Sequence, residues 1–414
     1  MNSLNELGVR AKAASKKLAL LGTEEKNNAL KAISKSLIDN LSTIIEANKI
    51  DLENGKNRGL KPSVLDRLEL NEKRVLDMAK GVMDLISLPD PIGLVLDEIV
   101  RPNGIKIKKI SVPMGVIGII YEARPNVTSD AAAICLKAGS SVILRGGKEA
   151  INSNIATVNI MREALKTVGL PEDLIILVTD TSRQSATDLM TLDRYLDLLI
   201  PRGGAGLIRA AVENSTVPVI ETGTGNCHAF VDESADLNTA LDIVVNGKVQ
   251  RPSVCNALET LLVHEKIADK ALPLICDKLN DLGVKILGCE KTCELIPYAT
   301  LASDEDYFTE FLDYIISVKV VKDIDEAIEH IDIHSTKHSE VIITKNADNA
   351  IRFQREIDSA AVYVNASTRF TDGGEFGLGA EIGISTQKLH ARGPMGLKEI
   401  TSYKYIIDGN GQIR

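Results

Sequence analysis

Cys255 is the residue whose sequence context most clearly predicts chemistry. It follows a polar, turn-forming Arg-Pro-Ser segment (251–253) and precedes an apolar, strand-like run from Ala257 to Val263. That order predicts a thiol at the mouth of a sheet rather than on a packed helix face. A thiolate is a strong nucleophile toward carbonyl and acyl carbon and can form a covalent intermediate. The first hypothesis is therefore a cysteine nucleophile.

Glycine-rich turns form a second group of residues that could do chemistry. Three such turns follow strand-like runs, at residues 145–148, 201–206 and 221–225, and the first two contain basic residues. In parallel sheets, ligands bind where the carboxyl ends of the strands open into loops. Glycines also make ordinary tight turns, and no Gly-x-Gly-x-x-Gly fingerprint joins a strand to a helix. The three turns together indicate a phosphate-bearing cofactor.

The segments around these turns alternate between strands and helices. Apolar strands are expected at residues 115–120, 141–144, 175–178, 198–200 and 217–220, and helices at 126–138, 148–168, 185–192 and 205–212. Continuous apolar strands between amphipathic helices predict a parallel sheet that is covered on both faces. A second α/β unit is expected from residue 229, and residues 1–86 are expected to be helical. The predicted class is α/β.

A hairpin is predicted around Asn103-Gly104. This pair separates two strand-like runs, 96–100 and 105–110, and an Asn-Gly turn places both of its central residues at positive φ. Such a hairpin either forms a contact between subunits or is an ordinary surface feature, and both interpretations stay open.

Composition excludes several classes of protein. The chain has 414 residues and a formal net charge of −9. The length predicts two or three domains, and the acidic balance argues against general binding to nucleic acid. No run of 18 apolar residues occurs, so no membrane span is expected. Six scattered cysteines do not form a disulfide framework and favour a reducing cytoplasm; Cys276, in an apolar helical segment, is predicted to fill the core.

Two further motifs are interpreted without a functional role. His330, His334 and His338 have a spacing that would align metal ligands on one helix. Polar residues among them favour a turn, so we predict a solvated loop and no metal. Glu259 would lie about 13 Å from Cys255 along an extended strand, which is too far for a local base.

Five stretches carry a resemblance to a known family. They are residues 113–128, 143–149, 200–204, 219–228 and 250–260. On these stretches, the chain resembles the aldehyde dehydrogenase superfamily along essentially its whole length, and within it the members that reduce an acyl phosphate. The resemblance implies two parallel-sheet α/β domains, one for the cofactor and one for catalysis, and a small β unit for oligomerisation.

The resemblance also implies domain boundaries. The cofactor-binding domain would comprise residues 1–97 and 113–226, and the catalytic domain residues 227–385. The hairpin and tail, residues 98–112 and 386–414, would form the oligomerisation unit.

By position in the family pattern, Cys255 is implied to be the nucleophile. Asn126 matches the side-chain amide that stabilises the oxyanion together with the backbone N–H of Cys255, and such donors are worth roughly 3–4 kcal/mol each. Arg124 and Arg251, each within four residues of a proposed catalytic group, are candidates for binding phosphate or the substrate carboxylate. Structural hydrogen bonds by both arginines are the open alternative.

Other positions are implied to bind the cofactor. Arg145 stands where many relatives have a lysine that contacts the ribose. Lys148 stands where an acidic residue would favour NAD, so its positive charge predicts NADP.

The remaining cofactor-site residues implied by the resemblance are Gly203, Gly204, Glu221, Gly223 and Glu310. Glu310 resembles a ribose-contacting glutamate, although the Phe-Gly-Pro that usually follows it is absent. Glu221 aligns with a glutamate that activates water in aldehyde-oxidising relatives. An acyl-phosphate reductase should not hydrolyse its thioester, so Glu221 is assigned either to the cofactor site or to a structural role.

The activity implied by the resemblance is the NADPH-dependent reduction of L-glutamyl 5-phosphate to L-glutamate 5-semialdehyde and phosphate, through a Cys255 thioester. This reaction is a step of proline synthesis from glutamate. A homo-oligomer, dimer or tetramer, is expected, and an association with glutamate 5-kinase is allowed. Two rival functions stay open: an NAD(P)-dependent dehydrogenase that oxidises another aldehyde, and a non-catalytic member of the fold.

Overall fold

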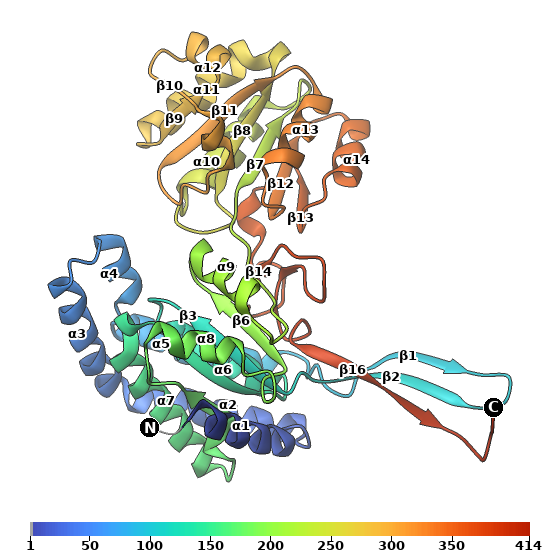
Figure 1. The fold of residues 1–414 in the computed structure, drawn as a ribbon. Coiled ribbons are helices and arrows are strands. Elements are labelled where there is room, and N and C mark those ends of the chain that lie inside the picture. Colours follow the sequence, from blue (N-terminus) through green and yellow to red (C-terminus); the bar gives the residue numbers. More distant parts are fainter. Residues whose placement is uncertain (1–2) are drawn as a thin grey trace. The chain divides into compact units, whose positions relative to one another are not determined.

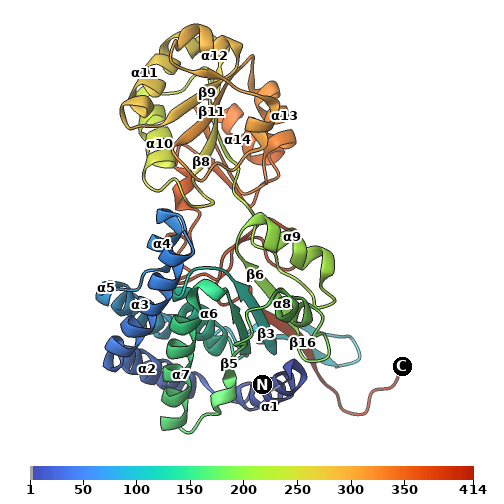
Figure 2. The same ribbon diagram turned by 60° about the vertical axis from the view of Figure 1, so that its left-hand side comes forward.

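The computed structural model describes residues 3–414, which fold as two compact units (Figures 1 and 2). Unit 1 contains the chain up to Thr222, together with Gly377–Gly383 and Met395–Arg414. Unit 2 contains Gly223–Phe376 and Ile384–Pro394. The chain therefore passes into unit 2 four residues before the boundary expected at residue 226.

Unit 1 begins with helices, as the apolar spacing predicted. They are α1 (Leu4–Leu18), α2 (Thr23–Asp39), α3 (Leu41–Asn57), α4 (Pro62–Leu68), α5 (Glu72–Asp84) and the 3₁₀ turn η1 (Leu85–Ser87). In α2, residues spaced three and four apart, Leu30, Ile33 and Leu37, are fully buried. None of the helices within residues 3–414 is long and apolar enough to cross a membrane.

A parallel sheet forms the centre of unit 1. Its strands are β3 (Val116–Tyr121), β4 (Ser141–Gly146), β5 (Ile175–Leu177) and β6 (Leu198–Arg202), in the order β5-β4-β3-β6. The connecting helices are α6 (Asn126–Lys137), η2 (Lys148–Ala150), α7 (Ile151–Thr167), η3 (Glu172–Leu174), α8 (Arg183–Met190) and α9 (Ala205–Asn214). The strand expected at residues 217–220 is wrong, because this segment makes only an isolated bridge from Val219 to Leu199.

The strand order of unit 1 contains a reversal. The chain moves outward from β3 to β5 and then returns to β6, on the other side of β3. At such a point, the loops that leave the carboxyl ends of two neighbouring strands turn to opposite sides and open a crevice. The turns after Tyr121 and Arg202 lie there.

A small antiparallel sheet joins the hairpin to the tail. It contains β1 (Val95–Val100), β2 (Lys106–Pro113) and β16 (Thr401–Asp408), in the order β1-β2-β16, and forms a long ribbon in Figure 1. The predicted turn geometry is wrong: among the turn residues only Gly104 has positive φ, at 85°. A five-residue connection, 101–105, replaces the two-residue turn, so a single left-handed residue is sufficient.

Unit 2 is built on a second parallel sheet, in the order β10-β9-β11-β8-β7-β12-β13. Its strands are β7 (Cys227–Val231), β8 (Leu258–His264), β9 (Lys285–Gly288), β10 (Thr300–Leu301), β11 (Ile315–Val321), β12 (Ser339–Ile343) and β13 (Ala361–Val364). Its helices are α10 (Leu237–Val249), η4 (Glu265–Ile267), α11 (Ala268–Asp281), α12 (Glu290–Leu295), η5 (Asp304–Phe308), α13 (Ile324–His334), α14 (Ala347–Glu356) and η6 (Thr368–Phe370). The short strands β14 (Ile384–Ser385) and β15 (Gly393–Pro394) pair separately.

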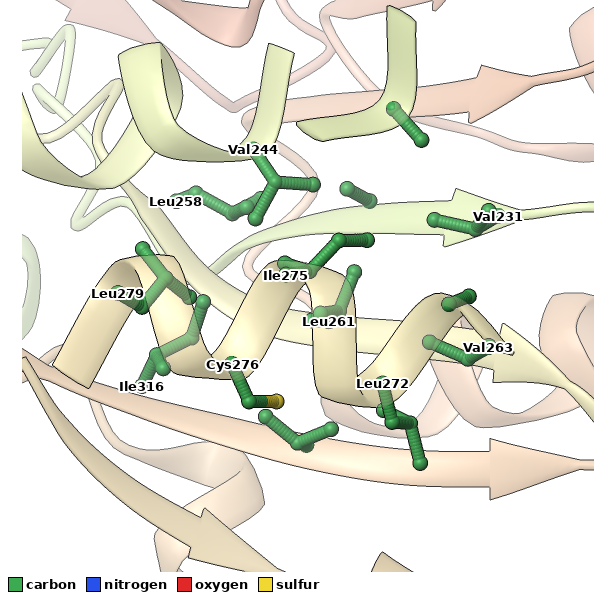
Figure 3. Packing of buried hydrophobic residues seen from close by; sticks show 14 of the residues in the cluster. Val231, Val244, Leu258, Leu261, Val263, Leu272, Ile275, Cys276, Leu279 and Ile316 are labelled. Atoms are coloured by element: carbon green, nitrogen blue, oxygen red, sulfur yellow. The ribbon is translucent and has the colours of Figure 1, made fainter. Parts of the chain in front are cut away.

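One core of unit 2 lies between this sheet and the helices α10 and α11 (Figure 3). A second cluster of buried residues, which includes Phe230 and Phe353, packs α13 and α14 against the sheet. Leu272, Ile275, Cys276 and Leu279 project from one stripe of α11 onto the sheet, where Leu261 of β8 is fully buried. The spacing of three and four along the helix produces this stripe. The prediction that Cys276 fills the core is confirmed.

Candidate active site

The loop that carries Cys255 joins α10 to β8, at the amino-terminal edge of the unit 2 sheet. The Cys255 side chain is half-buried. The buried Asn256 beside it donates from Nδ2 to the carbonyl oxygen of Thr371 over 2.9 Å, and the Thr368 hydroxyl donates to the carbonyl of Asn256 over 2.8 Å. These bonds anchor the peptide that follows the thiol.

Gly225 and Cys227 lie against the backbone carbonyl of Cys255. A Cβ atom at Gly225 would be 1.5 Å from that oxygen, so only glycine fits there. The Cys227 thiol donates to the same oxygen over 3.2 Å. Burial raises the pKa of Cys227 well above its usual value, which keeps this thiol protonated and leaves it a donor rather than a second nucleophile.

Glu310 lies beside the same segment. Its Oε1 accepts a hydrogen bond from the backbone N–H of Gly225 over 2.7 Å. Burial raises the pKa of Glu310, and the Gly225 N–H and the charge of Lys248 oppose that shift. The carboxylate predicted to contact a cofactor ribose is thus bonded here to the backbone next to residues 250–257. We call these residues the nucleophile loop, because they carry the predicted nucleophile.

Arg369 is a basic residue near Cys255 that the sequence reasoning missed. Its Nε donates to Oε1 of Gln250 over 3.0 Å. Burial and the charge of Arg251 lower the pKa of Arg369, while Asp372 and the Cys255 thiolate raise it. The guanidinium groups of Arg251 and Arg369 therefore both place positive charge near the nucleophile loop of unit 2. Nothing in the sequence indicated a role for Arg369, because this residue follows β13 in a segment without apolar periodicity.

In unit 1, Asn126 is the first residue of α6, and its side chain is exposed. Its Nδ2 donates to Oδ2 of Asp130, one turn later, over 3.0 Å. Desolvation raises the pKa of Asp130 to about 6. The carboxylate orients the amide of Asn126, and Arg124 lies exposed two residues before it.

Glu122 occupies the reversal point of the unit 1 sheet. Its Oε2 accepts the N–H of Gly204, the N-cap of α9, over 2.9 Å. A Cβ atom at Gly203 would lie 2.5 Å from the same oxygen. The close approach of the Glu122 carboxylate is therefore one reason why glycine occupies this turn. Sequence reasoning missed Glu122, although its place directly after β3 was the available signal.

The other residues predicted in unit 1 have different surroundings. The guanidinium of Arg145 donates to the carbonyl oxygens of Thr181 and Ser182 over 2.8 and 2.6 Å, and so holds the loop that follows β5. Lys148 is exposed in η2, and Glu221 is half-buried.

The structure divides the predicted site residues between the units. Unit 1 contains Arg124, Asn126, Arg145, Lys148, Gly203, Gly204 and Glu221, and unit 2 contains Gly223, Arg251, Cys255 and Glu310. A Cβ atom at Gly223 would lie 2.6 Å from the hydroxyl oxygen of Thr386, in the same unit.

The histidine motif is not the solvated loop that was predicted. Helix α13 continues to His334, and the rings of His330 and His334 stack with centroids 4.0 Å apart. His330 and His338 are buried, and Tyr307 packs edge-on against His330. Packing of the rings overrides the local turn preference, which acts only after the helix ends. Among residues 3–414, no group of three or more His, Cys, Asp or Glu is arranged to hold a metal ion.

Two parallel-sheet units, a thiol at one sheet edge and a glycine-lined reversal point in the other sheet define a dehydrogenase-like class of protein. The aldehyde dehydrogenase family model matches residues 4–305, and the chain belongs to this family. The family implies a nicotinamide cofactor. The α/β architecture predicted from the sequence is confirmed.

Three of the similar proteins share one name. The chain is 60% identical over 414 residues to the gamma-glutamyl phosphate reductase of Carboxydothermus hydrogenoformans, with 100% of both chains covered. It is 60% identical over 413 residues to the protein of that name from Clostridium perfringens, again with 100% of both covered. The crystal structure of the Thermotoga maritima gamma-glutamyl phosphate reductase matches with a TM-score of 0.98 at 52% identity, covering 100% of both chains.

Proposed function

We propose that this chain reduces L-glutamyl 5-phosphate to L-glutamate 5-semialdehyde and phosphate, in the synthesis of proline from glutamate. The observation that carries the proposal is the full-length identity of 60% with proteins named gamma-glutamyl phosphate reductase. The half-buried Cys255, held in an anchored loop, supports it because acyl transfer needs an accessible thiol at a fixed position.

In the proposed reaction, the Cys255 thiolate attacks the γ-acyl carbon, the bond from that carbon to the phosphate oxygen breaks, and phosphate leaves. The side-chain amide of Asn126 and the backbone N–H of Cys255 donate to the developing oxyanion. Arg124 and Arg251 balance the charge of the phosphate or of the substrate carboxylate. NADPH, when bound, supplies a hydride to the thioester carbon. The C–S bond then breaks, and the aldehyde and the thiol are released.

A phosphate-dependence assay separates this proposal from its rival, the oxidation of another aldehyde to an acid. The reverse reaction is followed as NADP reduction with glutamate 5-semialdehyde, with and without phosphate. Absolute dependence on phosphate is expected, because phosphate must attack the thioester carbon and displace the Cys255 thiolate. Oxidation that proceeds equally well without phosphate would instead favour a water-activating role for Glu221 and reject the proposal.

Exposed residues at the reversal point and after β4 of unit 1 support the binding of a dinucleotide cofactor. Gly203 and Gly204 are exposed and leave room at the reversal point, and Lys148 is an exposed cation after β4. The backbone N–H of Gly204 already donates to Glu122. The positive charge that balances the extra phosphate of NADP therefore has to come from another residue. We therefore assign NADP as the cofactor and Lys148 as the residue that favours it. Arg145, Glu221, Gly223 and Glu310 complete the proposed cofactor site.

Replacing Lys148 with methionine is expected to weaken NADPH binding by about tenfold, because the change removes one cation next to the extra phosphate. Binding of NADH should change less than twofold. Fluorescence titration of both cofactors measures this. Lys73→Met, at an exposed position on α5, is the matched control. Equal losses for both cofactors, or tighter NADH than NADPH binding by the wild type, would reject the assignment.

The units have proposed roles. We assign most of the cofactor-binding residues to unit 1, the nucleophile to unit 2 and self-association to the β1-β2-β16 sheet. The last assignment is supported by exposed apolar side chains on this sheet, including Val100 at 61%, Tyr405 at 57% and Ile407 at 62% exposure. Light scattering of the protein at micromolar concentration, showing a monomer, would reject the dimer or tetramer.

Cytoplasmic location and association with a glutamate 5-kinase belong to the same proposal, and co-sedimentation with the kinase tests the association.

A further inference from the structure

An ion pair is completely buried next to the nucleophile loop. Nζ of Lys248, near the end of α10, lies 2.5 Å from Oε2 of Glu259, the second residue of β8, and both side chains have 0% exposure. Burial raises the pKa of Glu259 to about 7 and lowers that of Lys248. Buried pairs of this kind often add little net stability, because desolvation offsets their attraction. Its position beside the nucleophile loop therefore points to a geometric role.

The second oxygen of Glu259 reaches a strained backbone position. Oε1 accepts a hydrogen bond from the N–H of Leu312 over 3.2 Å. Leu312 has a φ of 54°, in the left-handed region that a leucine rarely adopts. A bond from a buried carboxylate helps hold the backbone in this conformation. The ion pair thus fixes the segment between η5 and β11.

That segment carries Glu310, two residues before Leu312. The 2.7 Å bond from the N–H of Gly225 to Oε1 of Glu310 ties it to the chain that enters β7. Gly225 in turn packs directly on the carbonyl of Cys255. The loops that precede β11, β7 and β8 are therefore linked by contacts that run from Glu259 to Cys255. All three loops belong to unit 2.

We propose that Glu259 is a positioning residue: by accepting the N–H of Leu312, it keeps Glu310 bonded to Gly225 and Gly225 packed on the Cys255 peptide. The proposal rests on the proposed function only in its kinetic readout. The charge of Lys248 opposes the rise in the pKa of this carboxylate, and its bond to Oε2 fixes the rotation of the side chain. The position of the nucleophile loop depends on the hydrogen-bond acceptor at residue 259 and not on its charge.

Two double variants separate the acceptor from the charge. Lys248→Met/Glu259→Leu removes both the charges and the acceptor, whereas Lys248→Met/Glu259→Gln removes the charges and keeps an oxygen for Leu312. The matched control is Lys26→Met/Asp90→Leu in unit 1. There, Lys26 lies 2.6 Å from Asp90, and Asp90 accepts the N–H of Ile92 over 3.0 Å. All variants are compared by Tm, by kcat and KM, and by hydrogen exchange of the 223–227 peptide.

The leucine variant is expected to lose about 10- to 100-fold in kcat, since small displacements of a nucleophile have effects of this order, with KM changed less than threefold. Its 223–227 amides should exchange at least about tenfold faster, because the Gly225 bond opens. The glutamine variant should stay within about threefold of the wild type in both measurements, and the control should change Tm alone.

Wild-type kcat and wild-type exchange in the folded leucine variant would overturn the proposal. If that variant does not fold, the glutamine variant decides: a tenfold loss of kcat at wild-type Tm would show that charge, not the acceptor, matters. Hydrogen exchange needs no substrate, so it still reports on positioning if the phosphate-dependence assay rejects the proposed reaction.

Discussion

Replacing Cys255 with alanine is expected to abolish phosphate-dependent NADP reduction with glutamate 5-semialdehyde, by a factor on the order of 10⁴ or more. Without the thiol no thioester forms, and none of the neighbouring groups can replace it. The nearby Cys227 is buried, bonded to the Cys255 carbonyl and held as a thiol by its raised pKa. Steady-state rates at saturating substrate, with cofactor affinity measured separately, test this expectation.

Cys293→Ala is the matched control for Cys255. Its thiol is also half-buried in unit 2, but it lies on α12 and contacts the carbonyl oxygen of Gly288. This control should keep wild-type kcat, and both variants should bind NADPH normally. Reductase activity retained by Cys255→Ala at normal cofactor affinity would remove the covalent mechanism.

Replacing Asn126 with alanine is the second large expected effect. The loss of one oxyanion donor should lower kcat about 10²- to 10³-fold, with little change in KM, because the bond is made chiefly in the transition state. The side-chain amide of Asn126 is already oriented by its bond to Asp130, so the wild-type donor needs little reorganisation. Single-turnover rates of thioester formation measure the effect on the acylation step.

Asn214→Ala is the control for Asn126. Asn214 is the last residue of α9, exposed in the same unit, and its Nδ2 donates to the carbonyl of Ala210. We expect no change in kcat from this control. A loss below about threefold for Asn126→Ala at wild-type Tm would show that another group stabilises the oxyanion.

The helices and strands were largely predictable because their apolar spacing is local. Helix α6 and strand β4 begin at the predicted residues, Asn126 and Ser141. The errors occur where tertiary contacts override local preference. The expected strand at residues 217–220 lacks a continuous partner. His330 and His334 lie on α13, where their rings stack, instead of in a solvated loop.

The chemical residues were predictable only in part. Cys255 was predicted as the nucleophile from its flanking turn, but Glu122 and Arg369 were missed. Their hydrogen bonds, to Gly204 and to Gln250, join residues that are distant in the sequence. Glu259 was set aside because distance along a strand was the only available measure. Its partners, Lys248 and Leu312, approach from α10 and from the loop before β11.

By itself, the sequence determined the α/β class and the glycine-lined turns, because periodicity and short-range turn chemistry specify them, and it predicted Cys255 as the nucleophile. Only the tertiary structure decided that Cys255 lies at the amino-terminal edge of its sheet, where Gly225 and Glu310 also lie. Parallel pairing of β7, β8 and β11 brings their preceding loops to one edge. That juxtaposition depends on strand order, which no local pattern encodes.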